Sequence, residues 1–169
     1  AGFVGQGILS MGLNLAEAAM LEGRYVTYLP SYGAEVRGGT ANCTVAISDE
    51  EIASPVASSP EFVIAMNFPS LVRFQNHIQS GGLLFINSSI IETEITRGDI
   101  DIVSVPANSI AGRLGNPKSA NMVMLGAFIK KSQLISLPSV VEGLGDALKN
   151  KRKLISINKK AIAAGYDLF

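Results

Sequence analysis

The chain has 169 residues, 47% of them apolar and 17% charged, and fourteen basic side chains balance fourteen acidic ones. This length predicts a single domain over residues 1–169, and the zero net charge excludes a global field that would attract nucleic acid or an anionic membrane. The mean hydropathy is +0.31, yet no apolar run approaches the ~18 residues of a membrane span. We therefore expect the surplus apolar surface to contact protein.

The N-terminal region places a glycine-rich turn before a helix. The turn "GQG", Gly5 to Gly7, precedes apolar residues at mostly helical spacing from Ile8 to Met20, and Gly23 closes the stretch. Residues 1–4 read as the end of a preceding strand, whose beginning we expect before residue 1. Backbone N–H groups at a helix N-terminus favour an anion, so the turn is a candidate phosphate site. The alternative is a turn that only packs the helix against the strand.

The turn departs from the dinucleotide-binding fingerprint. Ser10 stands where the third glycine belongs, and the neutral "LPSY", residues 29–32, replaces the acidic residue expected after the second strand. This pattern disfavours NAD or FAD as the ligand.

Two β-rich runs follow the first helix. "YVTYLP", residues 25–30, is expected to end at Pro30, and "TANCTVAIS", residues 40–48, alternates apolar and polar side chains. The loop between them is too short for a helical crossover, so we predict an antiparallel pair within a mixed sheet.

The connecting loop "SYGAEVRGG", residues 31–39, carries the residue types of a ligand site. In a doubly wound sheet it would adjoin the "GQG" turn at the carboxyl edge. Arg37 supplies a forked cation for phosphate or carboxylate, Gly38 and Gly39 permit a close backbone approach, and Tyr32 can stack on a planar group. Glu35 can orient Arg37 or accept from a partner chain. The alternative is a charged turn in which Glu35 pairs with Arg37.

The remaining chain alternates strands and helices. The sequence predicts a strand–helix–strand unit over residues 61–89, a buried strand over 101–107, two helical stretches divided by Asn116-Pro117, and a last helix over 137–151. This alternation predicts an α/β, three-layer Rossmann-like fold with a mixed, mostly parallel sheet.

The titratable residues form no catalytic motif. His77 is expected at the surface, Cys43 as a small buried residue, and Lys149 to Lys153 as a solvated helix end. One cysteine cannot supply the four thiolates of an iron–sulfur cluster or an internal disulfide, so such a centre is expected on another chain. A lone thiol also favours a cytoplasmic location. The apolar run from Asn121 to Ile129 predicts a helix buried in the core or at a subunit contact.

Four stretches carry a resemblance to a known family: "GQGILSMGLNLAEAAMLEG", "SYGAEVRGGTANCTVAISDEEIASP", "GGLLFINSS" and "VPANSIAGRLGNPKSANMVMLGAF". Over most of its length the chain resembles the gamma subunit of 2-oxoacid:ferredoxin (or flavodoxin) oxidoreductases, with the 2-oxoglutarate enzymes the most similar. Val4 is one departure, because the family usually has a further glycine there.

The resemblance implies a subunit that is inactive alone. It implies alpha and beta subunits carrying thiamine diphosphate and Mg²⁺, often a ferredoxin-like delta subunit with iron–sulfur clusters, and a ferredoxin or flavodoxin acceptor. The complex would convert a 2-oxoacid and coenzyme A into acyl-CoA, CO2 and reduced ferredoxin.

In related single-chain enzymes the corresponding domain is implicated in holding coenzyme A. The resemblance therefore implies a coenzyme A site, with no catalytic or metal-binding residue on this chain, formed by Gly5, Gln6, Gly7, Tyr32, Arg37, Gly38 and Gly39. Two alternatives stay open at this point: a free-standing nucleotide-binding α/β module, and a purely structural assembly subunit.

Overall fold

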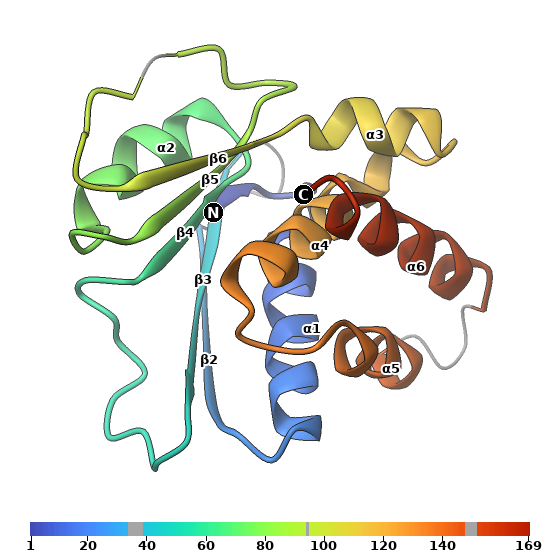
Figure 1. Cartoon of the computed structure of the whole chain (residues 1–169), viewed down its shortest axis with the longest axis horizontal. Helices are drawn as coiled ribbons and strands as arrows, with labels where there is room; N and C mark the ends of the chain where they lie inside the picture. The colour runs from blue at the N-terminus through green and yellow to red at the C-terminus, as the bar shows by residue number, and fades with distance from the viewer. Residues whose placement is uncertain (34–38, 94, 148–151) are drawn as a thin grey trace.

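The computed structural model describes residues 1–33, 39–93, 95–147 and 152–169, and Figure 1 shows strands on one side of a group of helices. The strands are β1 (Gly2–Phe3), β2 (Tyr25–Tyr32), β3 (Thr40–Ser48), β4 (Phe62–Ala65), β5 (Leu83–Asn87) and β6 (Asp101–Val105). The helices are α1 (Ile8–Leu21), α2 (Phe68–Phe74), α3 (Ala107–Arg113), α4 (Ala120–Ser132), α5 (Leu137–Ala147) and α6 (Arg152–Tyr166), with 3-10 turns η1 (Gln75–His77) and η2 (Pro117–Ser119).

The strands form two three-stranded units that Ala1 joins. One unit is antiparallel in the order β1-β3-β2, and the other is parallel in the order β4-β5-β6. The Ala1 nitrogen donates to the Ile64 carbonyl at 2.7 Å and the Met66 N–H donates to the Ala1 carbonyl at 2.9 Å, which is the pattern of a parallel pairing. The described strands thus make two antiparallel and two parallel pairings, and the hydrogen bonds of Ala1 connect the two units into the predicted mixed sheet.

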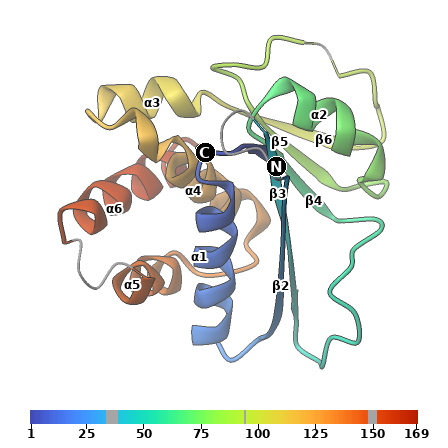
Figure 2. The same cartoon turned by 180° about the vertical axis from the view of Figure 1, so that it is seen from behind.

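Helices cover both faces of the parallel half. Along β5, Phe85 packs into the core under α1, α4, α5 and α6, whereas Leu84 and Ile86 pack on the opposite face in the cluster that includes Leu71 of α2. Figure 2 shows the same arrangement from behind. The alternation of neighbouring side chains between two apolar clusters confirms the predicted three-layer α/β fold.

Two predictions about element boundaries were wrong. β2 continues past Pro30 to Tyr32, because β2 is an edge strand of the described sheet and an edge strand tolerates a proline. The helix predicted over 137–151 is not the last one, because α6 follows it and starts at Arg152, inside the basic run assigned to a solvated helix end. Residues 149–151 of that run lie outside the described residues.

Among the described helices, none is long and apolar enough to cross a membrane.

Glycines allow α4 and α6 to touch backbone to backbone. A Cβ on Gly126 of α4 would overlap the carbonyl of Ile162, and a Cβ on Gly165 of α6 would overlap the carbonyl of Val123. Around this contact the helices bury small side chains, including Ala127. The packing of α6 against α4 therefore depends on glycine at positions 126 and 165 as much as on the apolar area that the two helices bury.

We expect Gly126→Ala to lower the free energy of unfolding by about 3 kcal/mol, because the neighbouring backbone must shift to admit the methyl group. Gly112→Ala in α3 is the matched control, since a Cβ there meets nothing within 4 Å; it should change the stability by at most about 1 kcal/mol, in the stabilising direction. Urea unfolding of the chain measures both. Equal effects of the two substitutions would contradict the close helix contact.

Candidate functional site

Strand β3 brings the two glycine loops together. Both β1 and β2 run antiparallel to β3, so their carboxyl ends lie at the same edge, where Ala41 pairs with Gly2 on one side and Tyr32 on the other. The Val4 N–H donates to the Gly39 carbonyl at 2.9 Å. The predicted proximity is therefore present for the turn after β1 and the described ends of the loop after β2, with the start of β3 between them.

A cavity lies where these segments meet, and we call it the junction cavity. Its volume of about 660 Å³ falls in the range of small-molecule sites, roughly 300–1,000 Å³. The lining is mostly apolar and includes the turn before α1, the first turn of α1 and the end of β2. It consists of Phe3, Val4, Gly5, Gly7, Ile8, Leu9, Ser10, Tyr32, Gly33 and Ala41.

The N-terminus of α1 faces this cavity without a side-chain cap. Gly7 is the N-cap residue at φ 72°, and no side chain accepts a hydrogen bond from the first turn of this 14-residue helix. The first N–H groups of a helix have no partner within it, and the residues that carry them, Ile8, Leu9 and Ser10, line the cavity. The positive end of the helix dipole therefore favours an anionic group at this point.

Three side chains from three other elements hold the first turn of α1. The amide of Asn121 in α4 donates to the Gly7 carbonyl at 3.0 Å, the Cys43 thiol in β3 to the Ile8 carbonyl at 3.7 Å, and the Tyr28 hydroxyl in β2 to the Leu9 carbonyl at 3.1 Å. Burial raises the pKa of the Cys43 thiol and of the Tyr28 hydroxyl, so both stay protonated and able to donate at neutral pH.

Sequence reasoning missed the role of Asn121. It treated the whole run from Asn121 to Ile129 as packing, and the run is indeed buried. The asparagine at its start is the signal that was available, because a buried amide needs hydrogen-bond partners. Its partner lies 114 residues away along the chain, so no local pattern could identify it.

Gln6 turns away from the junction cavity and braces the turn. Its Oε1 accepts the Phe3 N–H at 2.7 Å and the Asn67 amide at 3.1 Å, and its Nε2 donates to the Met66 carbonyl at 3.2 Å. These bonds tie the turn after β1 to the segment after β4. The side chain of Gln6 is thus engaged by the protein itself.

The other predicted site residues divide into two groups. Gly5, Gly7 and Tyr32 line the junction cavity, and Tyr32 is 67% exposed. Gly39 is buried next to it, where its carbonyl accepts from Val4. Glu35, Arg37 and Gly38 lie outside the described residues, and their predicted roles stay predictions.

His77 lies at the surface, as predicted, whereas Cys43 is less buried than predicted. His77 is exposed on η1 and its ring centroid lies 6.1 Å from that of Phe74. Cys43 is half-buried beside α1 and Val45. Within the described residues, no three His, Cys, Asp or Glu side chains gather as metal ligands.

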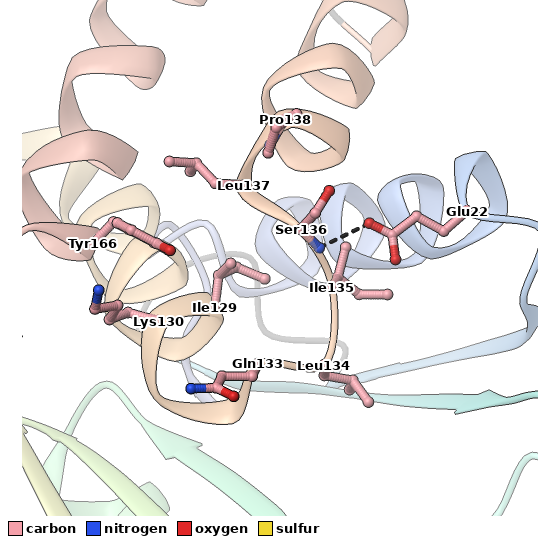
Figure 3. Close-up of a pocket in the computed structure, with 10 residues that line it drawn as sticks. All are labelled: Glu22, Ile129, Lys130, Gln133, Leu134, Ile135, Ser136, Leu137, Pro138 and Tyr166. Atoms are coloured by element: carbon pink, nitrogen blue, oxygen red, sulfur yellow. Dashed lines mark hydrogen bonds between the residues drawn. The ribbon is translucent and has the colours of Figure 1, made fainter.

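A second cavity, of about 510 Å³, lies in the helical layer between the end of α1, the α4–α5 connection and α6 (Figure 3). Its charged groups already have protein partners: the Glu22 carboxylate accepts the Ser136 N–H at 2.8 Å, and the Lys130 ammonium lies 4.8 Å from the Tyr166 ring centroid. Partial burial acts to raise the pKa of Glu22, but the hydrogen bonds from Ser136 and Ser139 and the nearby Arg24 outweigh it and leave that pKa below its usual value. The hydrogen bond between Glu22 and Ser136 therefore connects the end of α1 to the start of α5, and we assign this cavity a structural role.

Comparisons with known proteins agree on one family. Residues 1–168 match the family model described as pyruvate ferredoxin/flavodoxin oxidoreductase. Ketoisovalerate oxidoreductase subunit VorA of Methanothermobacter thermautotrophicus is 39% identical over 168 residues, which make up 99% of this chain and 35% of that protein. The chain spans about a third of the length of the first curated relatives it matches.

Solved structures give the same result. The gamma subunit of a keto/oxoacid ferredoxin oxidoreductase from Geobacter sulfurreducens aligns with a TM-score of 0.81 and 25% identity over 98% of this chain and 93% of that chain. The 2-oxoglutarate:ferredoxin oxidoreductase of Magnetococcus marinus, solved with 2-oxoglutarate, coenzyme A and succinyl-CoA bound, aligns with a TM-score of 0.90 and 25% identity over 99% of this chain and 29% of that chain.

Gly7→Ala tests how tightly Asn121 holds the turn. Gly7 and Gly23 have similar positive φ angles, 72° and 74°, but a Cβ on Gly7 would overlap the Asn121 amide, whereas one on Gly23 meets nothing within 4 Å. We expect Gly7→Ala to cost about 1–3 kcal/mol more in unfolding free energy than Gly23→Ala. The excess should largely disappear when Asn121 is replaced by alanine as well, because the overlap is then removed. A surplus that persists in the double variant would show that the overlap is not its cause.

Glu22→Gln tests this connection between α1 and α5 through pH. Because the folded-state pKa of Glu22 is lowered, the ionised carboxylate stabilises the fold above the ordinary glutamate pKa, and this contribution is lost as the pH falls through the folded-state value. The wild type should be more stable than Glu22→Gln at pH 7, and the difference should shrink below about pH 4.3. Thermal unfolding from pH 7 to pH 3 measures it, with the exposed Glu51→Gln as the control. A difference that does not depend on pH would contradict the role of the charge.

Proposed function

Because this chain belongs to the pyruvate ferredoxin/flavodoxin oxidoreductase family, we propose that it is the gamma-type part of a 2-oxoacid:ferredoxin oxidoreductase. The enzyme oxidatively decarboxylates a 2-oxoacid with coenzyme A and gives acyl-CoA, CO2 and reduced ferredoxin. The sequence resemblance favours 2-oxoglutarate as the acid, and the ketoisovalerate name of the VorA relative makes a branched-chain acid the substrate to test beside it.

The junction cavity is the observation that carries this proposal. It combines the uncapped N-terminus of α1, which favours an anion, with an apolar lining and the exposed ring of Tyr32. Coenzyme A has matching parts, since it carries phosphates, an aliphatic chain and a planar adenine. The coenzyme A in the related Magnetococcus marinus structure supports this choice of ligand.

In the proposed mechanism this chain binds and positions the co-substrate. Thiamine diphosphate with Mg²⁺ and iron–sulfur clusters would be held by the alpha, beta and delta parts and would supply the chemistry of decarboxylation and electron transfer. The N–H groups at the start of α1 hold a phosphate of coenzyme A, the glycines permit its close approach, and Arg37 adds a forked cation. Gln6 keeps the turn in place through its three hydrogen bonds.

The first experiment is anaerobic purification of the tagged chain from its native cells, followed by assays with a viologen dye. We expect partner chains to co-purify and the complex to reduce the dye only when coenzyme A and a 2-oxoacid are both present. Parallel assays with 2-oxoglutarate, pyruvate and 2-ketoisovalerate identify the acid. A lone, monodisperse chain that gains thermal stability with a nucleotide would favour the free-standing module instead.

Arg37→Ala tests the contribution of this chain to coenzyme binding. We expect the KM for coenzyme A to rise about tenfold or more, because a charge-assisted contact is lost. The KM for the 2-oxoacid should stay constant. Arg73→Ala, which removes an exposed cation from α2, is the control and should leave both constants unchanged. An Arg37 variant that fails to assemble, with normal coenzyme kinetics in whatever complex forms, would support the purely structural role.

A further inference from the structure

A second, smaller cavity lies on the other side of the Gly5–Gly7 turn, and we call it the crevice. Its volume is about 200 Å³, and its lining includes Gly5, Gln6, Met66, Asn108 and Lys118. Gly5 lines both this crevice and the junction cavity. A Cβ on Gly5 would meet nothing within 4 Å, so the backbone of the turn faces open space and the two cavities adjoin there.

The crevice occupies the position where α/β sheets bind ligands. β1 and β4 are neighbours through the hydrogen bonds of Ala1. The chain leaves β1 for α1 on one face of the sheet and leaves β4 for α2 on the other face. This reversal defines a topological switch point, and the space outside the carboxyl ends of the two strands is the usual ligand position. Gly5 and Gln6 follow β1 and Met66 follows β4, so they border that space.

Two polar side chains of the crevice, Lys118 and Asn108, offer hydrogen-bond donors, whereas the amide of Gln6 is already engaged by the turn. Lys118 is exposed on η2, and its ammonium makes no ion pair or hydrogen bond with the described residues. Asn108 accepts the Asn87 amide on its Oδ1 at 2.7 Å, which leaves its own NH2 group as a donor. The lining contains no aspartate or glutamate. One cation and an amide donor without a carboxylate suit an anionic oxygen group.

We propose that the crevice binds a phosphate group of coenzyme A, with Lys118 as its cation, while another part of the same molecule occupies the junction cavity. This inference rests on the proposed function. The volume of the crevice admits a phosphate, and Lys118 acts as a mobile point charge that reaches it from the solvent side. The ligand lies across the Gly5–Gly7 turn at Gly5, which has no side chain to separate the junction cavity from the crevice.

The test uses the assembled complex carrying Lys118→Ala, with Lys118→Arg as the conservative variant and Lys159→Ala as the control. Lys159 is exposed on α6 and lines neither cavity. Steady-state assays give kcat and the KM values for coenzyme A, 3′-dephospho-coenzyme A and the 2-oxoacid. We expect Lys118→Ala to raise the KM for coenzyme A about tenfold, with kcat and the KM for the acid within twofold of wild type. Lys118→Arg should recover most of the loss.

The dephosphorylated coenzyme shows which phosphate Lys118 contacts. If the KM for 3′-dephospho-coenzyme A is equal in wild type and Lys118→Ala, the contact is to the 3′-phosphate; if the variant weakens both coenzymes by the same factor, the contact is to the diphosphate. Either result supports the inference.

Three other results are distinguishable. An unchanged KM for coenzyme A in Lys118→Ala, in a wild-type complex that requires coenzyme A, overturns the crevice assignment and leaves the proposed function intact. A raised KM for the 2-oxoacid alone shows that the crevice receives the acid's carboxylate and also overturns the assignment. A wild-type complex without any dependence on coenzyme A would defeat the proposed function itself.

Discussion

The rest of the site depends on how the first turn of α1 is held. Three successive carbonyls, of Gly7, Ile8 and Leu9, accept hydrogen bonds from side chains of α4, β3 and β2. Each carbonyl has a second lone pair beside the one used by the helix, so these contacts add to the helical bonds without replacing them. These hydrogen bonds fix the position of the α1 N-terminus relative to β2, β3 and α4. The N–H groups of its first turn are therefore preorganised for a ligand.

This arrangement explains why the turn before α1 needs glycine at both ends. Gly5 and Gly7 have φ angles of 100° and 72°, which other residues rarely adopt. Gly7 also leaves the space that the Asn121 amide fills. Gln6, between the two glycines, needs its side chain, because that side chain forms hydrogen bonds with the segment after β4. The turn is thus braced from both sides while Gly5 stays open to two cavities.

The sequence predicted the elements that carry a strong local signal. The alternation in β3 and the Gly5–Gly7 turn were found because period and glycine spacing are visible over a few residues. α6 was missed, since its contact with α4 depends on Gly126 and Gly165 fitting against backbone rather than on a long apolar run. The hydrogen bond from Asn121 to Gly7 was missed for a related reason, because only the tertiary fold brings the two residues together. Local patterns therefore pointed to the candidate site, while the hydrogen bonds that hold its first helical turn became visible only in the structure.

The chemistry available at the junction cavity supports binding more than proton transfer. Its described lining offers backbone N–H groups, one serine hydroxyl and one tyrosine ring, with no carboxylate or imidazole. The Cys43 thiol lies behind the first turn of α1, and burial raises its pKa, which makes it a donor to a carbonyl and a poor nucleophile. His77 lies on η1 and does not line this cavity. A site of this composition stabilises a ligand through fixed dipoles and shape, which agrees with the proposed division of labour: this chain positions the acyl acceptor, and other parts of the enzyme carry the reacting cofactors.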